Sequence, residues 1–224
     1  SLTYDTTADR VLILWTRDVP FGSRSGRAVV GTISTGTPFG TLTSLGTEIQ
    51  FAVNPYMTGA AYNVDNNCVG ISFRNDDVSN YLYVMGAKVD GSDNSVVGGT
   101  EIAVTSEYSA SYTQGVTYST VMDKFTFAYY LTAGYKYRNL NVSSDATPVT
   151  TLDTAVDFPS TSDGEYANYY DPDEDAVVFT WRRGGGPWGA QAITPAYTST
   201  NVTAENFVGI ADGAISASAS GEII

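Results

Sequence analysis

The sequence predicts an all-β fold made of four repeats of about 56 residues, each with the outline of a four-stranded β-propeller blade. Three observations lead to this prediction. One register recurs along the chain without a gap, apolar residues alternate inside it, and the composition is rich in Thr and Ser, with 16 Tyr and 22 Gly in 224 residues. Such a composition favours strands and turns over helices.

Each copy of the register opens with a tyrosine and carries an Asp or Asn five positions later. The copies occupy residues 4–18, 62–76, 118–132 and 170–184. Their opening residues are Tyr4, Tyr62, Tyr118 and Tyr170, at spacings of 58, 56 and 52 residues. A period of this length is typical of propellers, solenoids and arrays. It also favours a surface-presenting scaffold over an enzyme with a single pocket.

Inside each copy the apolar residues alternate with period two, which indicates a β-strand. In the first copy Val11, Ile13 and Trp15 point to one side, and Leu12 and Leu14 point to the other. Because both sides are apolar, we expect these strands to be covered on both faces. The polar segment just before each strand predicts the tight loop of a hairpin whose first strand ends near the tyrosine.

Two more strands complete each predicted repeat. A third strand is expected at 27–33, 81–89, 134–142 and 190–193. A fourth is expected to begin with Gly-Thr-Glu-Ile, which occurs at 46–49 and 99–102, with looser echoes at 153–156 and 202–205. A β-sandwich would not need one register four times, and the coils of a parallel β-helix are usually shorter. Whether four blades close a ring alone, belong to a larger ring or form an open array is left open.

The predicted repeats are 1–57, 58–107, 108–160 and 161–206, so that 1–206 forms one repeat domain. Residues 207–224 break the pattern, and their small side chains predict an exit segment toward a following domain or stalk. The chain has no initiator Met and stops at Ile224, so we expect a piece of a longer polypeptide.

Composition excludes several classes of function. A net charge of −13 with only 11 basic residues argues against nucleic acid or an anionic membrane as partner. No apolar run is long enough to insert into a membrane. The absence of His removes His-based catalytic and metal sites, and we expect no cofactor. The single cysteine, Cys68, stands where other copies have Arg10, Lys124 or Ala176, which predicts an ordinary strand residue.

The pattern of an Asp or Asn, an apolar strand ending in an aromatic residue, Arg-Asp at 17–18, Val-Gly-Thr-Ile at 30–33 and Gly-Thr-Glu-Ile resembles repeat modules of phage tail-fibre and other virion-surface proteins. The segment ENFVGIADGAIS at 205–216 is similar to the end of such repeat regions. The resemblance covers nearly the whole chain, although the fourth repeat lacks Gly-Thr-Glu-Ile. It implies an oligomeric, extracellular part of the virion surface, with other virion proteins, copies of itself or a host-surface glycan as partners and no catalytic residues.

The loop from Trp181 to Trp188 is the richest in candidate contact residues. Two indole rings flank Arg182, Arg183 and a glycine run. Aromatic faces stack on sugars or partner side chains, and guanidinium groups add planar donors. Trp181 shares the inward aromatic position of Trp15, so Trp188 with Arg182 or Arg183 is the predicted contact surface.

Two further groups are candidates. Tyr135 and Tyr137 belong to an aromatic cluster whose exposed members are predicted to contact carbohydrate or a neighbouring subunit. Asp171, Asp173 and Asp175 alternate in the loop DPDED, which fits either a solvated hairpin turn or a weak calcium site. The glycine and the distal Glu of an EF-hand loop are missing there.

These observations predict a non-enzymatic structural or receptor-contacting component of a phage appendage. Two alternatives stay open: a secreted or cell-surface carbohydrate-binding propeller module, and a glycan-processing propeller enzyme. The enzyme has less in its favour, because the Asp-box loops of sialidase-type propellers are matched only by Phe179-Thr-Trp181 after Asp175, without the glycine.

Overall fold

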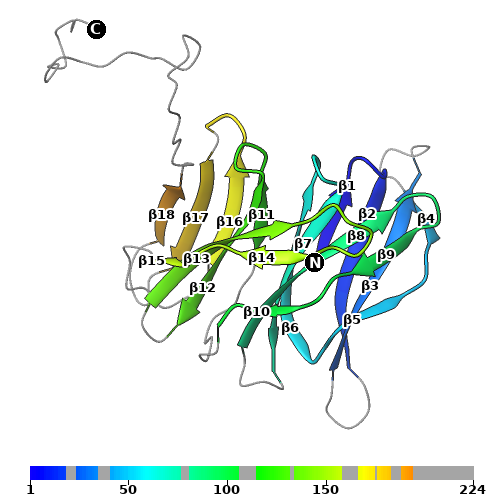
Figure 1. The fold of residues 1–224 in the computed structure, drawn as a ribbon, viewed down its shortest axis with the longest axis horizontal. Coiled ribbons are helices and arrows are strands. Elements are labelled where there is room, and N and C mark those ends of the chain that lie inside the picture. The colour runs from blue at the N-terminus through cyan, green and yellow to red at the C-terminus, as the bar shows by residue number, and fades with distance from the viewer. Residues whose placement is uncertain are drawn as a thin grey trace, which may run out of the picture.

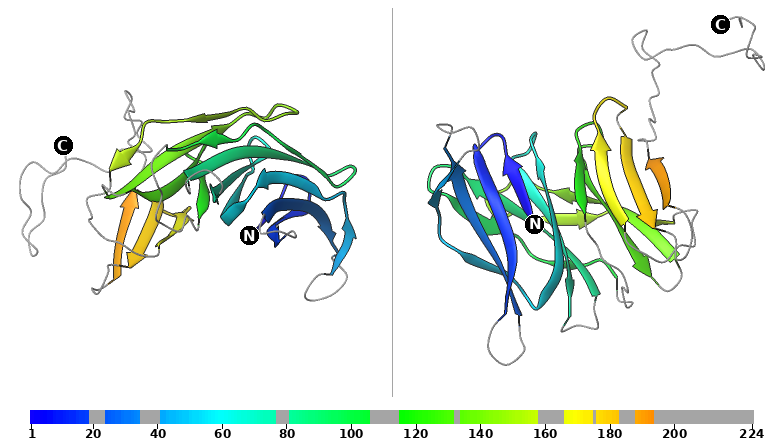
Figure 2. Two further views of the ribbon diagram at one scale, coloured as in Figure 1. Left: turned by 90° about the horizontal axis from the view of Figure 1, so that it is seen from below. Right: turned by 180° about the vertical axis from the view of Figure 1, so that it is seen from behind.

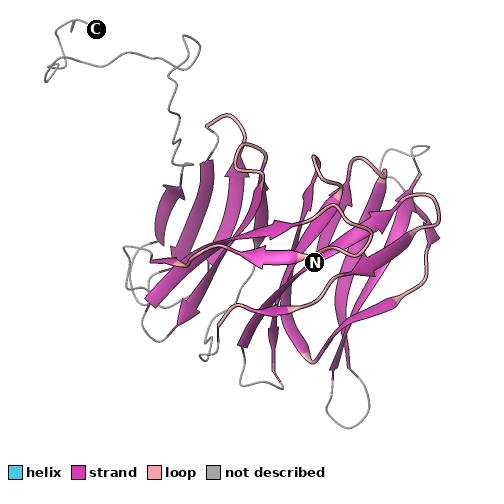
Figure 3. Ribbon diagram, viewed as in Figure 1, coloured by secondary structure: helices cyan, strands magenta, loops and turns pink. Residues whose placement is uncertain are grey.

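The computed structural model describes residues 1–18, 24–34, 41–76, 81–105, 115–131, 134–157, 166–174, 176–182 and 188–193. Within these ranges the regular structure is β-strand, arranged in four antiparallel sheets (Figures 1 and 3). The all-β prediction is therefore confirmed. No helix in the described ranges is long and apolar enough to cross a membrane.

The sheets follow one another along the chain. Sheet 1 contains β1 (Leu2–Asp5), β2 (Arg10–Asp18), β3 (Arg24–Ile33), β4 (Leu42–Leu45) and β5 (Ile49–Val53). Sheet 2 contains β6 (Pro55–Asn63), β7 (Cys68–Asn75), β8 (Tyr81–Asp90), β9 (Ser95–Gly98) and β10 (Ile102–Ala103). Sheet 3 contains β11 (Val116–Ser119), β12 (Lys124–Leu131), β13 (Gly134–Val142), β14 (Thr150–Leu152) and β15 (Val156–Asp157). Sheet 4 contains β16 (Tyr166–Asp171), β17 (Ala176–Arg182) and β18 (Trp188–Ile193).

Each sheet opens with a hairpin in the same register. The opening tyrosine lies opposite the first apolar residue of the second strand, in the pairs Tyr4–Val11, Tyr62–Val69, Tyr118–Phe125 and Tyr170–Val177. The residue after the tyrosine holds the turn. In sheet 1 the Oδ1 atom of Asp5 accepts hydrogen bonds from the backbone N–H groups of Thr7 and Ala8, at 2.9 and 2.7 Å. Such side-chain bonds to the backbone favour a turn over strand continuation.

The Asp or Asn at the end of the turn has a separate backbone role. Asp9, Asn67 and Asp123 have φ angles of 55°, 51° and 49°, in the left-handed region. Among residues with a Cβ atom, Asn and Asp tolerate this region best. The chain must adopt this conformation to enter the second strand, which explains why the register carries Asp or Asn at this place.

Alternation gives each sheet two faces. We call the leading face the one that carries Val11, Ile13 and Trp15 in sheet 1, and the trailing face the opposite one, which carries Leu12 and Leu14. The aligned leading residues are Val69, Ile71 and Phe73 in sheet 2, Phe125, Phe127 and Tyr129 in sheet 3, and Val177, Phe179 and Trp181 in sheet 4.

The apolar cores of the described chain lie between consecutive sheets. Between sheets 1 and 2, Leu12 and Leu14 pack against the leading residues of sheet 2. Between sheets 2 and 3, Leu82 and Val84 pack against those of sheet 3. Between sheets 3 and 4, Ala128 packs with Val177 and Phe179. Each core therefore joins the trailing face of one sheet to the leading face of the next, and sheets 2 and 3 are covered on both faces as their sequences predict.

The four sheets form an arch (Figure 2) with sheets 1 and 4 at its two ends. Their first strands lie in line, because β1 contacts β6, β6 contacts β11, and β11 contacts β16. Within the described residues, no strand of sheet 1 makes more than a marginal contact with a strand of sheet 4.

A strand begins at the last residue of each predicted tetrapeptide, because β5 starts at Ile49, β10 at Ile102 and β15 at Val156. The sequence did not predict the short strands that precede them, β4, β9 and β14, and both short strands of each sheet lie along the third strand. The N–H groups of Gly46 and Gly99 donate to that third strand, to the carbonyls of Val30 and Gly86, both at 2.8 Å. The echo at 202–205 lies outside the described residues.

The tetrapeptide needs a glycine because the backbone of the next sheet lies against it. A Cβ atom on Gly46 would overlap the backbone carbonyl of Asn94 in sheet 2, and one on Gly99 would overlap that of Pro148 in sheet 3. Each glycine thus lets the outer loop of the following sheet approach the backbone closely.

Replacing Gly99 by Ala should destabilise the fold by about 1–3 kcal/mol, because backbone atoms must shift to admit the methyl group. The neighbouring Gly98→Ala is the matched control. Its Cβ would meet only the flexible end of Met85, at 2.8 Å, so it should be close to neutral. Urea unfolding of both variants measures the difference, and equal midpoints for the two would contradict this account of the tetrapeptide.

Candidate interaction surfaces

The opening tyrosines connect neighbouring sheets beside their hairpin turns. The hydroxyl of Tyr118 lies 2.7 Å from Oδ2 of Asp65, in the turn of sheet 2, and 2.8 Å from Oδ1 of Asp123, in its own turn. The hydroxyl of Tyr170 lies 2.9 Å from Oγ1 of Thr120, in the turn of sheet 3. Each of these tyrosines therefore reaches the turn of the preceding sheet.

Burial and neighbouring carboxylates keep the hydroxyl of Tyr118 protonated. Burial raises the pKa of Tyr118 far above its ordinary value, and hydrogen bonds to the carboxylates of Asp65 and Asp123 raise it further. Asp123 also accepts hydrogen bonds from Nδ2 of Asn63 and Asn66, at 3.2 and 3.1 Å. Asp123 is thus the centre of a polar cluster that ties the turn of sheet 2 to that of sheet 3.

The hydroxyl of Tyr62 donates to Oδ1 of Asn67, in its own turn, at 3.3 Å. Burial raises its pKa to about 12, a hydrogen bond with Thr7 lowers it, and the carboxylate of Asp5 raises it again. Asp5 is the last residue of β1, and Thr7 lies in the hairpin turn that follows it. The hydroxyl of Tyr4 likewise donates to its own turn, at Asp9.

A cationic cluster joins sheets 1 and 2 away from these turns. The guanidinium carbons of Arg24 and Arg74 lie 5.3 and 4.5 Å from the centre of the Tyr56 ring. Both arginines also pair with Asp76, at 3.1 and 3.0 Å. Stacking on an aromatic face and pairing with a carboxylate stabilise the two guanidinium groups together.

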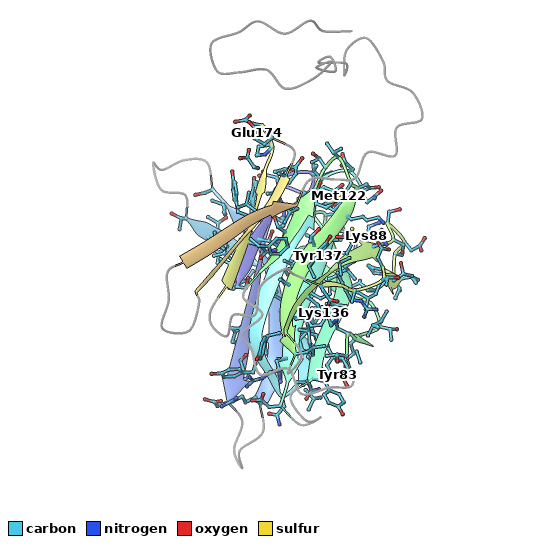
Figure 4. The ribbon with its side chains drawn as sticks, turned by 90° about the vertical axis from the view of Figure 1, so that its left-hand side faces the viewer. Tyr83, Lys88, Met122, Lys136, Tyr137 and Glu174 are labelled. Atoms are coloured by element: carbon cyan, nitrogen blue, oxygen red, sulfur yellow. The ribbon has the colours of Figure 1, made fainter. Side chains whose placement is uncertain are left out.

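A groove of about 640 Å³ lies beside the hairpin turns of sheets 1 and 2. Its lining includes Thr7, Asn67, Lys88, Asp90 and Ala146. The ammonium of Lys88 donates to the carbonyl of Ser144, at 2.6 Å, and so ties β8 of sheet 2 to the β13–β14 loop of sheet 3. Figure 4 shows Lys88 and, at the tip of the turn of sheet 4, Glu174.

Cys68 is fully buried at the start of β7 and lies 3.7 Å from the carbonyl of Val142 in sheet 3. Burial raises the pKa of its thiol to about 12. A buried, protonated thiol is a poor nucleophile. Cys68 therefore serves to pack the apolar core between sheets 2 and 3.

The predicted contact residues fall in different parts of the chain. Arg182 and Trp188 pair with each other at the end of the β17–β18 hairpin. Their side chains, and the whole of Arg183, lie outside the described part of the structure, so their contact role stays a prediction. Tyr135 pairs with Tyr130 in β12, and its side chain likewise lies outside the described part. Tyr137 is half-buried and packs against Phe179, with ring centres 6.0 Å apart, in the third core.

The acidic loop of sheet 4 is a hairpin turn. Oδ1 of Asp171 accepts hydrogen bonds from the backbone N–H groups of Asp173 and Glu174, at 3.0 and 3.4 Å, as Asp5 does in sheet 1. Asp175 lies outside the described residues. Within the residues that are described, no three His, Cys, Asp or Glu side chains form a group that could hold a metal ion.

Sequence reasoning missed the contacts of the tyrosines with the preceding sheet. The register marked these residues as equivalent, and a polar residue follows each of them, at Asp5, Asn63, Ser119 and Asp171. That pairing of an aromatic hydroxyl with a polar turn was the available signal. Its partner could not be read from the sequence, because the partner belongs to another copy.

No protein-family model matches the chain, and no curated protein is significantly similar to it in sequence.

Tyr118→Phe should lower the free energy of unfolding by about 1.5–3 kcal/mol, because Asp65 and Asp123 lose a donor in a poorly solvated place. Tyr4→Phe is the matched control and should change little, since its hydroxyl bonds only within its own exposed turn. Chemical denaturation of the two variants beside the unchanged chain tests this. An equal loss in both would mean that the hydroxyl of Tyr118 does not join the sheets.

Stability should fall as the pH rises above about 10, the pKa of an exposed tyrosine. The folded state raises the pKa of Tyr62 to about 12 and that of Tyr118 as well, so the unfolded chain loses these protons first. The contribution is complete below pH 10 and disappears as the pH passes the folded values. Phenolate absorbance and circular dichroism, recorded together, should show these tyrosines ionising only as the fold is lost. Their ionisation in the intact fold near pH 10 would contradict it.

Proposed function

We propose that the four sheets are blades of a β-propeller-type module and that the chain is a non-enzymatic structural or receptor-contacting part of a phage appendage. The observation that supports a scaffold is the sameness of its interfaces. Each described interface joins a trailing face to a leading face. Such stacking fixes the hairpin turns and loops at defined places, as a surface that presents contacts requires.

The appendage itself is inferred from the sequence. Its support is the resemblance of the strand, Val-Gly-Thr-Ile and Gly-Thr-Glu-Ile elements to repeat modules of tail-fibre and virion-surface proteins. The net charge of −13 is compatible with an exposed protein that stays soluble.

The receptor contact is assigned to the end of the β17–β18 hairpin. Arg182 and Trp188 occupy directly opposed positions there, so their Cα atoms are neighbours across the two strands. An indole face and a guanidinium group are side-chain types suited to the ring face and hydroxyls of a sugar. Arg183 follows Arg182 in the sequence.

Trp188→Ala should abolish binding of the chain to the surface of susceptible host cells, while Trp188→Phe should keep part of it, since an aromatic face remains. Competition with labelled virions or labelled chain measures the loss. If Trp188→Ala competes as well as the unchanged chain, the hairpin is not the contact site. Binding of the isolated chain to a purified glycan without any virion association would favour the carbohydrate-binding module, and release of a sugar product would favour the enzyme.

A further inference from the structure

Sheet 1 exposes a large part of the face that the other sheets bury, although Val11 and Val29 on the same face are each 7% exposed. Leu2 and Tyr4, on its leading face, are 67% and 42% exposed, whereas Val116 and Tyr118 at the same places in sheet 3 are each 7% exposed. Ile13 and Trp15 are also partly exposed, although their counterparts in sheets 2 and 3 are almost fully buried.

The outer strand of sheet 1 extends this apolar face. Gly31 pairs with Val11, and a Cβ atom on it would run into the side chains of Leu42 and Leu45. These two leucines therefore lie on the leading face, and both are exposed. A leading face with Leu2, Tyr4, Ile13, Trp15, Leu42 and Leu45 is an uncovered apolar surface, which in soluble proteins marks an interaction site.

Sheet 4 exposes the opposite face. Thr180, on its trailing face, is exposed, whereas Leu14 and Ala128 at the same place in sheets 1 and 3 are each 2% exposed. Tyr169 lies on the same face, opposite Val178, and is 63% exposed. The two ends of the arch thus present the two halves of the interface that occurs inside it.

We propose that these two faces bind each other between copies of the chain, so that the leading face of sheet 1 packs on the trailing face of sheet 4 of a second copy. This rests on the proposed propeller-type architecture. The contact continues the step that already joins sheets 1 to 2, 2 to 3 and 3 to 4. Because sheets 1 and 4 of one chain stand at opposite ends of the arch (Figure 2), a second copy meets the open face without any change in the internal interfaces.

The hydrogen bonding of the turns fits the same contact. Asp65 stands three positions after Tyr62 and accepts from Tyr118 of the next sheet. In sheet 4 the residue three positions after Tyr170 is Asp173, in an exposed turn. In the proposed contact, Tyr4 of a second copy donates to Asp173, as Tyr118 donates to Asp65 within one chain.

Sedimentation velocity of the 224-residue chain over a range of concentrations tests the contact. The chain should form dimers or longer head-to-tail assemblies, and added salt should strengthen them by screening two copies of charge −13. Leu2→Glu on one face or Tyr169→Glu on the other should weaken association about tenfold or more, which is a free-energy loss of about 1.4 kcal/mol. Val149→Glu, at an exposed residue between β13 and β14, is the control and should leave association unchanged.

Mixing the two blocked variants gives the decisive result. At a concentration where the unchanged chain is mostly dimeric, each blocked variant alone should be mostly monomeric, but the mixture should form a one-to-one dimer, because each partner supplies one intact face. Circular dichroism confirms that both variants fold. A monomeric unchanged chain at every concentration, a control that dissociates equally, or a mixture that stays monomeric would each overturn the proposal. No receptor is needed, so failure of this contact is distinct from failure of the receptor contact at Trp188.

Discussion

The packing of one trailing face on the next leading face is the constraint from which the rest of the structure follows. Apolar burial drives this contact, but burial alone has no direction and would let two flat sheets slide or turn on each other. Polar and steric features at both edges of the interface remove that freedom. At the turn edge Tyr118 and Tyr170 reach Asp65 and Thr120, and at the outer edge Gly46 admits the backbone of the next sheet.

One of these two edge contacts is a hydrogen bond, and the other is steric. The tyrosine contact is a hydrogen bond that loses most if its acceptors are left without a donor, so it penalises displacement along the strands. The glycine contact is steric, since any Cβ atom would separate the two backbones. Asp153 stands where Gly46 and Gly99 stand in the other sheets, and it forms an ion pair with Lys124 at 2.6 Å. A side chain is therefore accommodated at this place in sheet 3, where it pairs with a lysine of its own sheet.

The sequence predicted what is local and missed what is not. Period-two alternation located the second and third strands, because each residue's face is set by its neighbours in the same strand. The reason for the glycine of Gly-Thr-Glu-Ile was missed, since it is required by Asn94 or Pro148, about fifty residues away in the next sheet. Tyr137 looked like a contact residue because aromatic side chains suit both cores and binding surfaces, and only the position of Phe179 shows its packing role.

The composition of the exposed face of sheet 1 follows from the same constraint. An antiparallel sheet with one solvated face normally alternates apolar and polar residues. Sheet 1 does not: Val11, Ile13 and Trp15 stand beside Leu12 and Leu14, so both faces are as apolar as those of the covered sheets. Exposing that face costs solubility, which the acidic charge of the chain offsets only at long range. A leading face kept apolar, with a tyrosine in the position that elsewhere reaches a neighbouring turn, has the composition of an interface and not of a surface in water.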